Sequence, residues 1–395
     1  MAKRKFVLPG IQELSKEQED ARALPKKGRH LIIGGPGTGK SVLALLRSRR
    51  HHIDKDNYLF LVFNHLLHQA SLHLLNDTLT SRTWQSWFSG FFNECTNQSI
   101  PKLPPKRETN WQDIDWENTL RIIADVAPPK NPDLLPFLII DEGQDMPPKF
   151  YQSLAQLGFE NFYVVADQNQ QIISGSNSSR RDIEIELAIS TDDVIELNDN
   201  YRNSYQTARL AREFYTGDPA SPPPNLPSTK RTAKTPLLVE YGEKGRFNFK
   251  SVIHAILKTA DRDPSKLLGI ITPDNEVRRR YFDGLSNVNL KLDNGTPKIQ
   301  TYQSGNDAAK LTFNEGGIMV INAQSCKGLE FDVVLLADID QYHCTPMLID
   351  EKKRLFYVMV ARARESVIML KNGDNKHCPV DAIIPQNPEI LEIRR

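Results

Sequence analysis

Cysteine is scarce in this sequence. Its 395 residues include four, Cys95, Cys326, Cys344 and Cys378, and no two of them form a C-x-x-C pair. Small secreted domains held together by disulfides carry cysteine at much higher density, and structural zinc sites use thiolates at paired spacings. The sequence therefore predicts reduced thiols in a cytoplasmic protein and no structural zinc centre.

Long apolar runs and an excess of charge of one sign are also missing. No segment approaches the roughly 20 apolar residues that a membrane-spanning helix requires. The apolar stretch near the N-terminus is broken by Pro9, too early for a signal peptide. Lys and Arg number 50 against 49 Asp and Glu, for a net charge of +1. We therefore expect no membrane partner, and a nucleic acid would have to be held by a local basic groove.

What the chain does contain is a series of short apolar segments typical of buried strands. They occupy residues 30–33, 58–63, 136–140, 162–166, 267–271, 317–321 and 333–337. Helical segments such as 41–50 separate them, which favours an α/β fold class with parallel sheets. We expect two domains, residues 1–195 and 196–395, with a small insertion at about 101–136 and a proline-containing surface loop at 217–236.

The glycine-rich segment after the first strand predicts a phosphate-binding loop. It matches G-x-x-x-x-G-K-[ST] with Gly34, Gly35, Pro36, Gly37, Thr38, Gly39, Lys40 and Ser41. In such a loop the backbone N–H groups surround phosphates, the lysine reaches the β and γ phosphates, and the hydroxyl binds Mg²⁺. A strand before it and a helix after it are the context that this motif requires. Kinases, GTPases and transporters share the loop, so it does not identify the reaction.

A pair of carboxylates narrows the chemistry. Asp141 and Glu142 directly follow the apolar strand at 136–140. Asp141 is placed to hold the Mg²⁺ shell, and Glu142 is placed to accept a proton from an attacking water. A glutamate beside the metal-binding carboxylate favours hydrolysis of ATP over transfer of phosphate to a second substrate.

With these two segments, further motifs resemble those of UvrD/Rep-type superfamily 1 helicases, in the family's order and over nearly the whole chain. They are the segments 14–21, 141–145 (D-E-G-Q-D), 165–172, 200–202 (N-Y-R), 324–331 and 357–363. The resemblance implies two RecA-like P-loop NTPase domains with an ATP cleft between them, and ATP and Mg²⁺ as cofactors. The chain looks like a compact member without the large inserted domains, because about 120 residues separate Arg202 from Gln324.

The resemblance assigns the base and the ribose of ATP to four residues. Gln18 matches the glutamine that reads the adenine edge, and its amide can both donate and accept a hydrogen bond. Tyr201 matches the tyrosine that stacks on the base. Gly328 and Glu330 belong to the motif whose glutamate contacts the ribose.

Three further matches concern the γ-phosphate. Gln170 corresponds to the residue that senses it, and Arg202 and Arg362 correspond to two arginines that reach it from the second domain. Arginine fingers of this kind contribute about 10³–10⁵ in rate. They also make closure of the cleft depend on whether ATP or ADP is bound. The predicted catalytic set is Lys40, Glu142, Gln170, Arg202 and Arg362.

Other matches predict contacts to single-stranded DNA. They are Phe63, Asn64, Thr83, Trp84, Ser86, Gln324 and Ser325. Rings stack on bases, while hydroxyl and amide groups take phosphates. The aromatic residues are equally well explained as core, more so for the neighbouring Trp87 and Phe88. Arg47, Arg49, Arg50 and the run 278–280 fit either a basic groove or solvated helix faces.

Two departures from the family pattern bear on function. Gly175 stands where the family usually carries a base-stacking tryptophan, and Ser41-Val42 stands where it carries threonine and arginine. We expect a DNA-stimulated ATP hydrolase that translocates on single-stranded DNA, 3′→5′ by resemblance. The alternative is a regulatory ATPase subunit that acts with a partner nuclease or other effector, as in phage defence. RNA stays open as the nucleic acid, and a catalytically dead scaffold is disfavoured.

Overall fold

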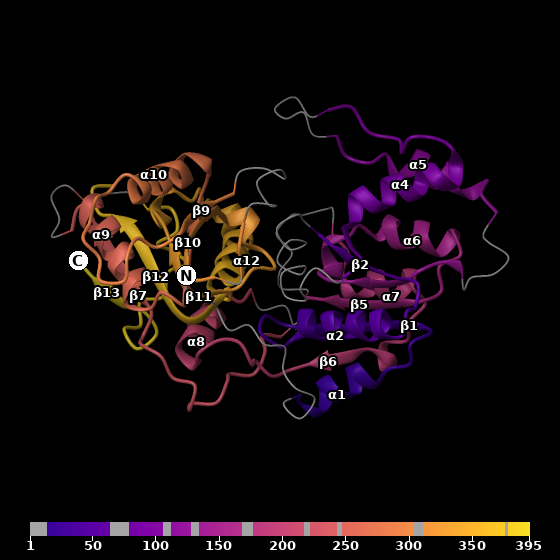
Figure 1. Ribbon diagram of the computed structural model, residues 1–395, viewed down its shortest axis with the longest axis horizontal. Coiled ribbons are helices and arrows are strands. Elements are labelled where there is room, and N and C mark those ends of the chain that lie inside the picture. The colour runs from indigo at the N-terminus through magenta and orange to yellow at the C-terminus, as the bar shows by residue number, and fades with distance from the viewer. Residues whose placement is uncertain are drawn as a thin grey trace.

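The chain forms an α/β structure with two parallel sheets, each covered by helices on both faces (Figure 1). The computed structural model describes residues 14–63, 79–105, 112–127, 134–167, 177–216, 222–242, 247–302, 311–313, 315–375 and 378–395. In this part of the chain no helix is both long and apolar enough to cross a membrane. The first sheet and its helices are here called the N-terminal lobe, and the second sheet and its helices the C-terminal lobe.

The N-terminal lobe is built on a six-stranded sheet in the order β3-β2-β4-β5-β1-β6. Its strands are β1 (Arg29–Gly34), β2 (Tyr58–Val62), β3 (Ser81–Thr83), β4 (Phe137–Ile140), β5 (Phe162–Ala166) and β6 (Ile195–Leu197). Its helices are α1 (Lys16–Ala23), α2 (Lys40–Ile53), α4 (Trp84–Thr96), α5 (Trp116–Ala124), α6 (Pro148–Gln156) and α7 (Arg180–Glu186). Every strand pairing is parallel, so all carboxyl ends lie at one edge of the sheet.

Alternate residues of these strands face opposite layers, as the pleat of a strand requires. Leu31 and Ile33 of β1 pack in the cluster that contains the apolar residues of α4, α6 and α7. Ile32, between them, packs instead with Leu43 and Ala44 of α2. Burial on both faces explains why these strands read as continuous apolar runs in the sequence.

The C-terminal lobe is built on a seven-stranded sheet in the order β13-β7-β12-β11-β8-β10-β9. Its strands are β7 (Leu237–Tyr241), β8 (Leu267–Thr272), β9 (Ile299–Thr301), β10 (Gly317–Asn322), β11 (Phe331–Leu336), β12 (Ala363–Asn372) and β13 (Glu392–Arg394). Its helices are α8 (Tyr205–Glu213), α9 (Phe249–Arg262), α10 (Asn275–Ser286) and α12 (Ile349–Val360). The α8 and α12 residues pack on one face and the α9 and α10 residues on the other.

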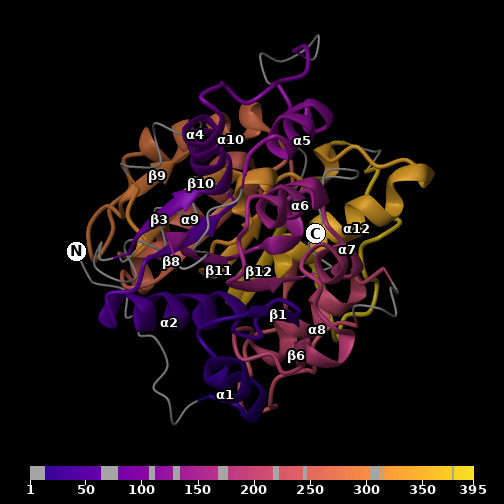
Figure 2. The same cartoon turned by 90° about the vertical axis from the view of Figure 1, so that its right-hand side faces the viewer.

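A short crossover joins the lobes. Strand β6 ends at Leu197 beside β1, and α8 begins at Tyr205 against β12 of the other sheet. The view turned by 90° looks at the molecule from the side of the N-terminal lobe, with α4 and α5 at the top and α1 at the bottom (Figure 2). Residues 198–204 therefore carry the chain from one lobe to the other.

The expected strands agree with the structure to within a few residues at each end, and six shorter or more polar strands were not anticipated. These are β3, β6, β7, β9, β12 and β13. Several lie at or near a sheet edge, where one side is solvated and the apolar run is broken. The predicted insertion at 101–136 contains α5, whose Ile123 is buried in the same cluster as α6.

Candidate nucleotide-binding site

The glycine-rich loop lies between the carboxyl end of β1 and the start of α2. Gly37 has φ of 81°, a left-handed conformation that favours glycine. A Cβ on Gly37 would lie 2.3 Å from Asn200 Oδ1. The Thr38 hydroxyl donates to the Gly35 carbonyl at 2.8 Å and tightens the turn. The loop is therefore packed directly against the crossover.

Lys40 is buried in this loop and folds back over it. Its Nζ donates to the Gly35 carbonyl at 2.8 Å and lies 3.3 Å from Asp167 Oδ2. Asp167 is fully buried and directly follows β5. The ammonium group of Lys40 is thus paired with a buried carboxylate.

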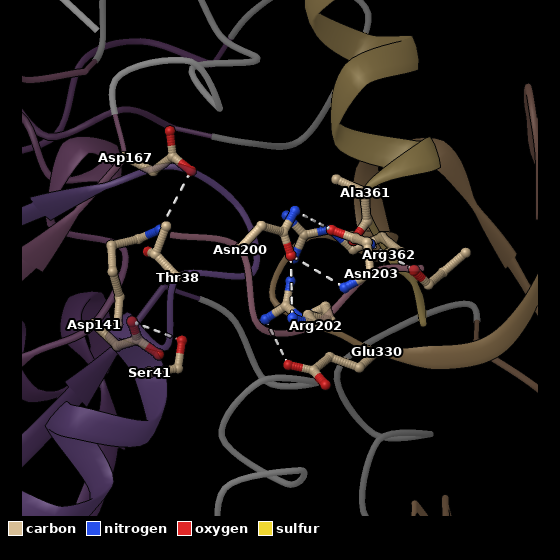
Figure 3. Close-up of polar contacts among 12 residues, drawn as sticks. Thr38, Ser41, Asp141, Asp167, Asn200, Arg202, Asn203, Glu330, Ala361 and Arg362 are labelled. Carbon is tan, nitrogen blue, oxygen red and sulfur yellow. Dashed lines mark hydrogen bonds and ion pairs between the residues drawn. The ribbon is translucent and has the colours of Figure 1, made fainter. Parts of the chain in front are cut away.

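Ser41 and Asp141, the two predicted Mg²⁺ ligands, lie together (Figure 3). The Ser41 hydroxyl donates to Asp141 Oδ1 at 3.2 Å. Burial, together with the charge of Glu142, raises the pKa of Asp141 to about 7. A hydroxyl beside a carboxylate is a set of hard oxygen donors that suits Mg²⁺, and the cation would remove the cost of burying that charge. The residues present fit the metal.

Glu142 is held rigidly at the end of β4. Its backbone is left-handed, with φ of 54°, and its Oε2 accepts from Gln144 Nε2 at 2.6 Å. Although burial opposes ionisation, Lys327, Arg362 and Lys40 lower the pKa of Glu142. The carboxylate is therefore ionised and available as a proton acceptor.

An ion pair between the lobes closes over these carboxylates. Lys327 Nζ of the C-terminal lobe lies 2.6 Å from Asp145 Oδ1 of the N-terminal lobe, and both side chains are 4% exposed. Asp145 belongs to the one-turn segment Gly143–Asp145, which follows Glu142. The two sheets are therefore tied together at the predicted catalytic residues.

The two predicted arginine fingers approach from the crossover and from the start of β12. Arg202 Nη2 lies 2.5 Å from Glu330 Oε1 (Figure 3). Arg362 is 2% exposed, and its Nε donates to the Val358 carbonyl at 3.1 Å. Burial and the neighbouring charge of Arg202 lower the pKa of Arg362.

The charged groups of this site neutralise one another. Lys40 lies against Asp167, Arg202 against Glu330, and Lys327 against Asp145. An entering polyphosphate has to exchange with these carboxylates, because buried charges are costly unless they are paired. The arrangement can respond to a polyanion by rearranging ion pairs on both sides of the lobe interface.

Gln18 and Tyr201, the predicted adenine contacts, bond to adjacent residues of the loop. Gln18 Nε2 donates to the Thr38 carbonyl at 2.8 Å, and its Oε1 accepts from the Ser15 N–H at 3.0 Å. One donor and one acceptor position of that amide remain for a base edge. Tyr201 is 41% exposed, its N–H donates to the Gly37 carbonyl at 2.8 Å, and its ring is accessible. Gly328, in the loop before Glu330, has φ of 77°.

Several predicted DNA contacts are not accessible. Trp84 is 4% exposed and stacks on Trp116, with ring centroids 6.4 Å apart, so its ring lies in the core, one of the two explanations that the sequence leaves open. Thr83 is buried, and Phe63 packs partly into the same core. Ser86 and Gln324 are exposed, and Ser325 is half-buried. Asn64 and Gln170 lie outside the described residues, as does Gly175.

Two of the candidate groove arginines are also structural. Arg47 is 4% exposed and donates to the carbonyls of Leu24 and Pro25. Arg278 is 3% exposed and donates to Asn275 and Thr301. The expectation that these two arginines line a basic groove is therefore corrected, because a buried guanidinium that donates to groups of the protein itself cannot reach a phosphate backbone.

Sequence reasoning missed three contributors to the site. Asp167 pairs with Lys40, Asn203 bonds to the strand that begins beside Arg362, and the ring of Pro224 lies where a Cβ on Gly35 would be. Asp167 carried a usable signal, since it directly follows an apolar strand. Asn203 and Pro224 carried none, because their partners are distant in the sequence.

Comparison with known proteins finds a match for part of the C-terminal lobe. Residues 317–370 match the model of the family described as UvrD-like helicase C-terminal domain. Curated proteins give no match. A solved structure, the C-terminal domain of a possible DNA helicase from Lactobacillus plantarum WCFS1, is 16% identical with a TM-score of 0.34, over 49% of this chain and 98% of that one. The segment from β10 to β12, which carries Lys327, Glu330 and Arg362, is therefore similar to the C-terminal domain of UvrD-like helicases.

Proposed function

We propose that the chain is a DNA-stimulated ATPase that uses hydrolysis to move along single-stranded DNA. The observation that carries the proposal is the meeting of two sets of groups at the lobe interface. Lys40, Ser41 and Asp141 come from the N-terminal lobe, while Arg202 and Arg362 come from the crossover and the helicase-like C-terminal segment. A phosphate loop on one side and arginines on the other suit nucleotide-dependent closure.

In this proposal two RecA-like motor domains divide near Leu197, where the first sheet ends. The loop N–H groups and Lys40 hold the β and γ phosphates, and Ser41 with Asp141 holds Mg²⁺, which supplies charge neutralisation on the phosphates. Glu142 takes a proton from the attacking water, which its ionised state and fixed position allow. Arg202 moves from Glu330 to the γ-phosphate, and Glu330 contacts the ribose.

The loss of ATP's γ-phosphate reverses these exchanges. Arg202 returns to Glu330 and Lys40 to Asp167, so the two lobes no longer share a ligand. The Lys327–Asp145 pair continues to join the lobes at the site. Cycling between these states supplies the relative motion that translocation needs, and the family pattern favours 3′→5′ movement with RNA as a second substrate to test.

Variants of the catalytic groups test the proposal. Lys40→Ala should abolish ATP hydrolysis and weaken nucleotide binding, whereas Glu142→Gln should abolish hydrolysis and keep binding, since it removes only the proton acceptor. Steady-state phosphate release and fluorescent-nucleotide titration separate the two effects. Full hydrolysis by Glu142→Gln would sink the assigned mechanism.

A strand-displacement assay tests direction. Partial duplexes with a 3′ or a 5′ single-stranded tail should show unwinding or displacement of a bound protein only from the 3′ tail. Activity only from the 5′ tail would reverse the assignment. ATPase activity that requires a second protein would favour the alternative, a regulatory subunit acting with a nuclease or other effector.

A further inference from the structure

The side-chain amide of Asn203 is buried and forms hydrogen bonds to the backbone on both sides of Arg362. The Asn203 side chain is 1% exposed. Nδ2 donates to the Ala361 carbonyl at 3.1 Å and to the Ala363 carbonyl at 2.5 Å (Figure 3). Both amide hydrogens are therefore used on the two residues that flank the arginine, about 160 positions further along the chain.

The direction of these hydrogen bonds is fixed at both ends. Asn203 Oδ1 accepts from Asn200 Nδ2 at 2.8 Å. Asn200 Oδ1 in turn accepts from the backbone N–H groups of Arg202, at 3.0 Å, and Asn203, at 3.1 Å. Carbonyls at one end only accept and N–H groups at the other only donate, so neither amide can be turned round without losing its partners.

The other end of this network rests on the phosphate loop. Asn200 Oδ1 occupies the space beside Gly37, where a Cβ would be 2.3 Å away. The Tyr201 N–H donates to the Gly37 carbonyl at 2.8 Å. A continuous set of contacts therefore runs from Gly37 through Asn200 and Asn203 to the backbone of Arg362.

The guanidinium at the end of this network is sensitive to small displacements. Arg362 is buried beside Arg202, a like charge, which together with burial lowers its pKa. Its carbonyl accepts from the Phe331 N–H at 3.0 Å, and its N–H donates to the Met359 carbonyl at 3.2 Å. Buried charges depend on where their counter-charges lie, so a backbone shift at this point changes what the side chain can reach.

We propose that Asn203 is a positioning residue for Arg362, which it holds in register with the phosphate loop. Through Asn203 the state of Gly37 is transmitted to the start of β12, and the guanidinium is aimed at the γ-phosphate only when the crossover is seated on the loop. The inference rests on the proposed function, since the γ-phosphate is the group that Arg362 is aimed at.

The first test substitutes the amide itself. Asn203→Ala removes both grips, and Asn203→Asp keeps the shape but sets a carboxylate against two carbonyl oxygens. A displacement of about 1 Å in a catalytic group can cost about 10²-fold in rate, so both variants should lower kcat roughly 10- to 100-fold. KM for ATP should change far less, because the finger acts on the transition state.

Thr207→Val is the matched control. Thr207 is fully buried in α8, and its Oγ1 donates to the Glu365 carbonyl at 3.2 Å, so it ties the helix that follows Asn203 to the same strand without flanking Arg362. This variant should keep the kcat of the wild type. An equal loss in Thr207→Val and Asn203→Ala would show a general role in holding α8 and would overturn the positioning role.

A double-substitution cycle asks whether Asn203 acts through the arginine. In an Arg362→Ala background, Asn203→Ala should cause no further loss of kcat, since the group it positions is gone. Losses that multiply would overturn the proposal.

Nucleotide binding separates this inference from the proposed function. Wild-type protein should bind ADP with aluminium fluoride, a mimic of the phosphoryl group in the transition state, more tightly than ADP alone, and Asn203→Ala and Arg362→Ala should lose that preference to the same extent. If the wild type binds nucleotide without hydrolysing it, the proposed function fails and this comparison still decides the role of Asn203. If only Arg362→Ala loses the preference, or if the wild type shows none, the positioning role is overturned.

Discussion

At the scale of single residues, the site is governed by charges that already have partners. Lys40, Arg202 and Lys327 each form an ion pair with a carboxylate. The phosphates of a nucleotide would therefore have to replace these carboxylates as partners of the cationic side chains. Affinity in such a site depends on small differences between paired states, so the backbone that places each group matters as much as the group itself.

Gly37 is the position where a side chain should disturb this backbone most. Gly37→Ala forces a left-handed alanine with its Cβ against Asn200 Oδ1. It should reduce the free energy of unfolding by about 1–3 kcal/mol and weaken ATP binding. Urea unfolding and fluorescent-nucleotide titration measure the two effects.

Gly90→Ala is the control for this glycine substitution. Gly90 lies inside α4, and a Cβ there meets nothing within 4 Å. Helix propensity then predicts a gain of about 0.5–1 kcal/mol with nucleotide binding unchanged. Equal effects of the two substitutions would show that Gly37 has no special contact with the crossover.

The limits of prediction from sequence also lie in individual contacts. Residues 34–41 and 141–142 form local patterns, so their roles follow from order and spacing alone. The burial of Trp84 could not be predicted from the sequence, because the rings that cover it, Trp116 and Phe150, come from helices that are remote in the sequence. The burial of Arg47 could not be predicted either, because the carbonyl groups that it bonds to lie in a different segment of the chain.

At the scale of secondary structure, α2 begins in the phosphate loop and is packed into the core at its far end. His51 near the end of this helix is 1% exposed, packs against Phe137 with ring centroids 4.6 Å apart, and has its Nδ1 2.9 Å from Asp56 Oδ2. Burial, with the nearby charge of Arg47, lowers the pKa of His51 to about 4 from 6.5. The histidine is therefore neutral in the folded protein at physiological pH.

This pKa predicts a pH-dependent contribution to stability. Between pH 6.5 and about 4 the unfolded chain binds a proton at His51 and the folded chain does not, so stability falls as the pH is lowered through this window. His51→Gln removes the titration. The advantage of the wild type over His51→Gln in urea unfolding should therefore shrink from pH 7.5 to pH 4.5. A difference that grows on acidification would mean that a protonated His51 pairs with Asp56 instead.

At the scale of the whole molecule, the two lobes are joined by the crossover and by a buried ion pair. Lys327 and Asp145 are 182 residues apart in the sequence, and they belong to different lobes. Removing one partner of a buried pair leaves an uncompensated charge and costs about 3–5 kcal/mol, whereas replacing both with apolar groups costs far less. The pair is thus a sensitive reporter of whether the lobes meet in solution.

Substitutions of Lys327 and Asp145, singly and together, use this reporter. Lys327→Met should destabilise the protein by about 3–5 kcal/mol, and Lys327→Met with Asp145→Leu should recover most of the loss. Lys371→Met is the control, because its partner Asp381 is 54% exposed and such pairs contribute about 0–1 kcal/mol. Additive losses from Lys327 and Asp145 in urea unfolding would show that the lobes do not meet there in solution.

The central claim is that nucleic acid and ATP act on one motor. The most direct measurement is steady-state ATP hydrolysis by the purified chain without nucleic acid, with single-stranded DNA and with single-stranded RNA, with Lys40→Ala as the blank. The account predicts faster hydrolysis with single-stranded DNA and none by Lys40→Ala. Hydrolysis by the wild type that no single strand accelerates would contradict it.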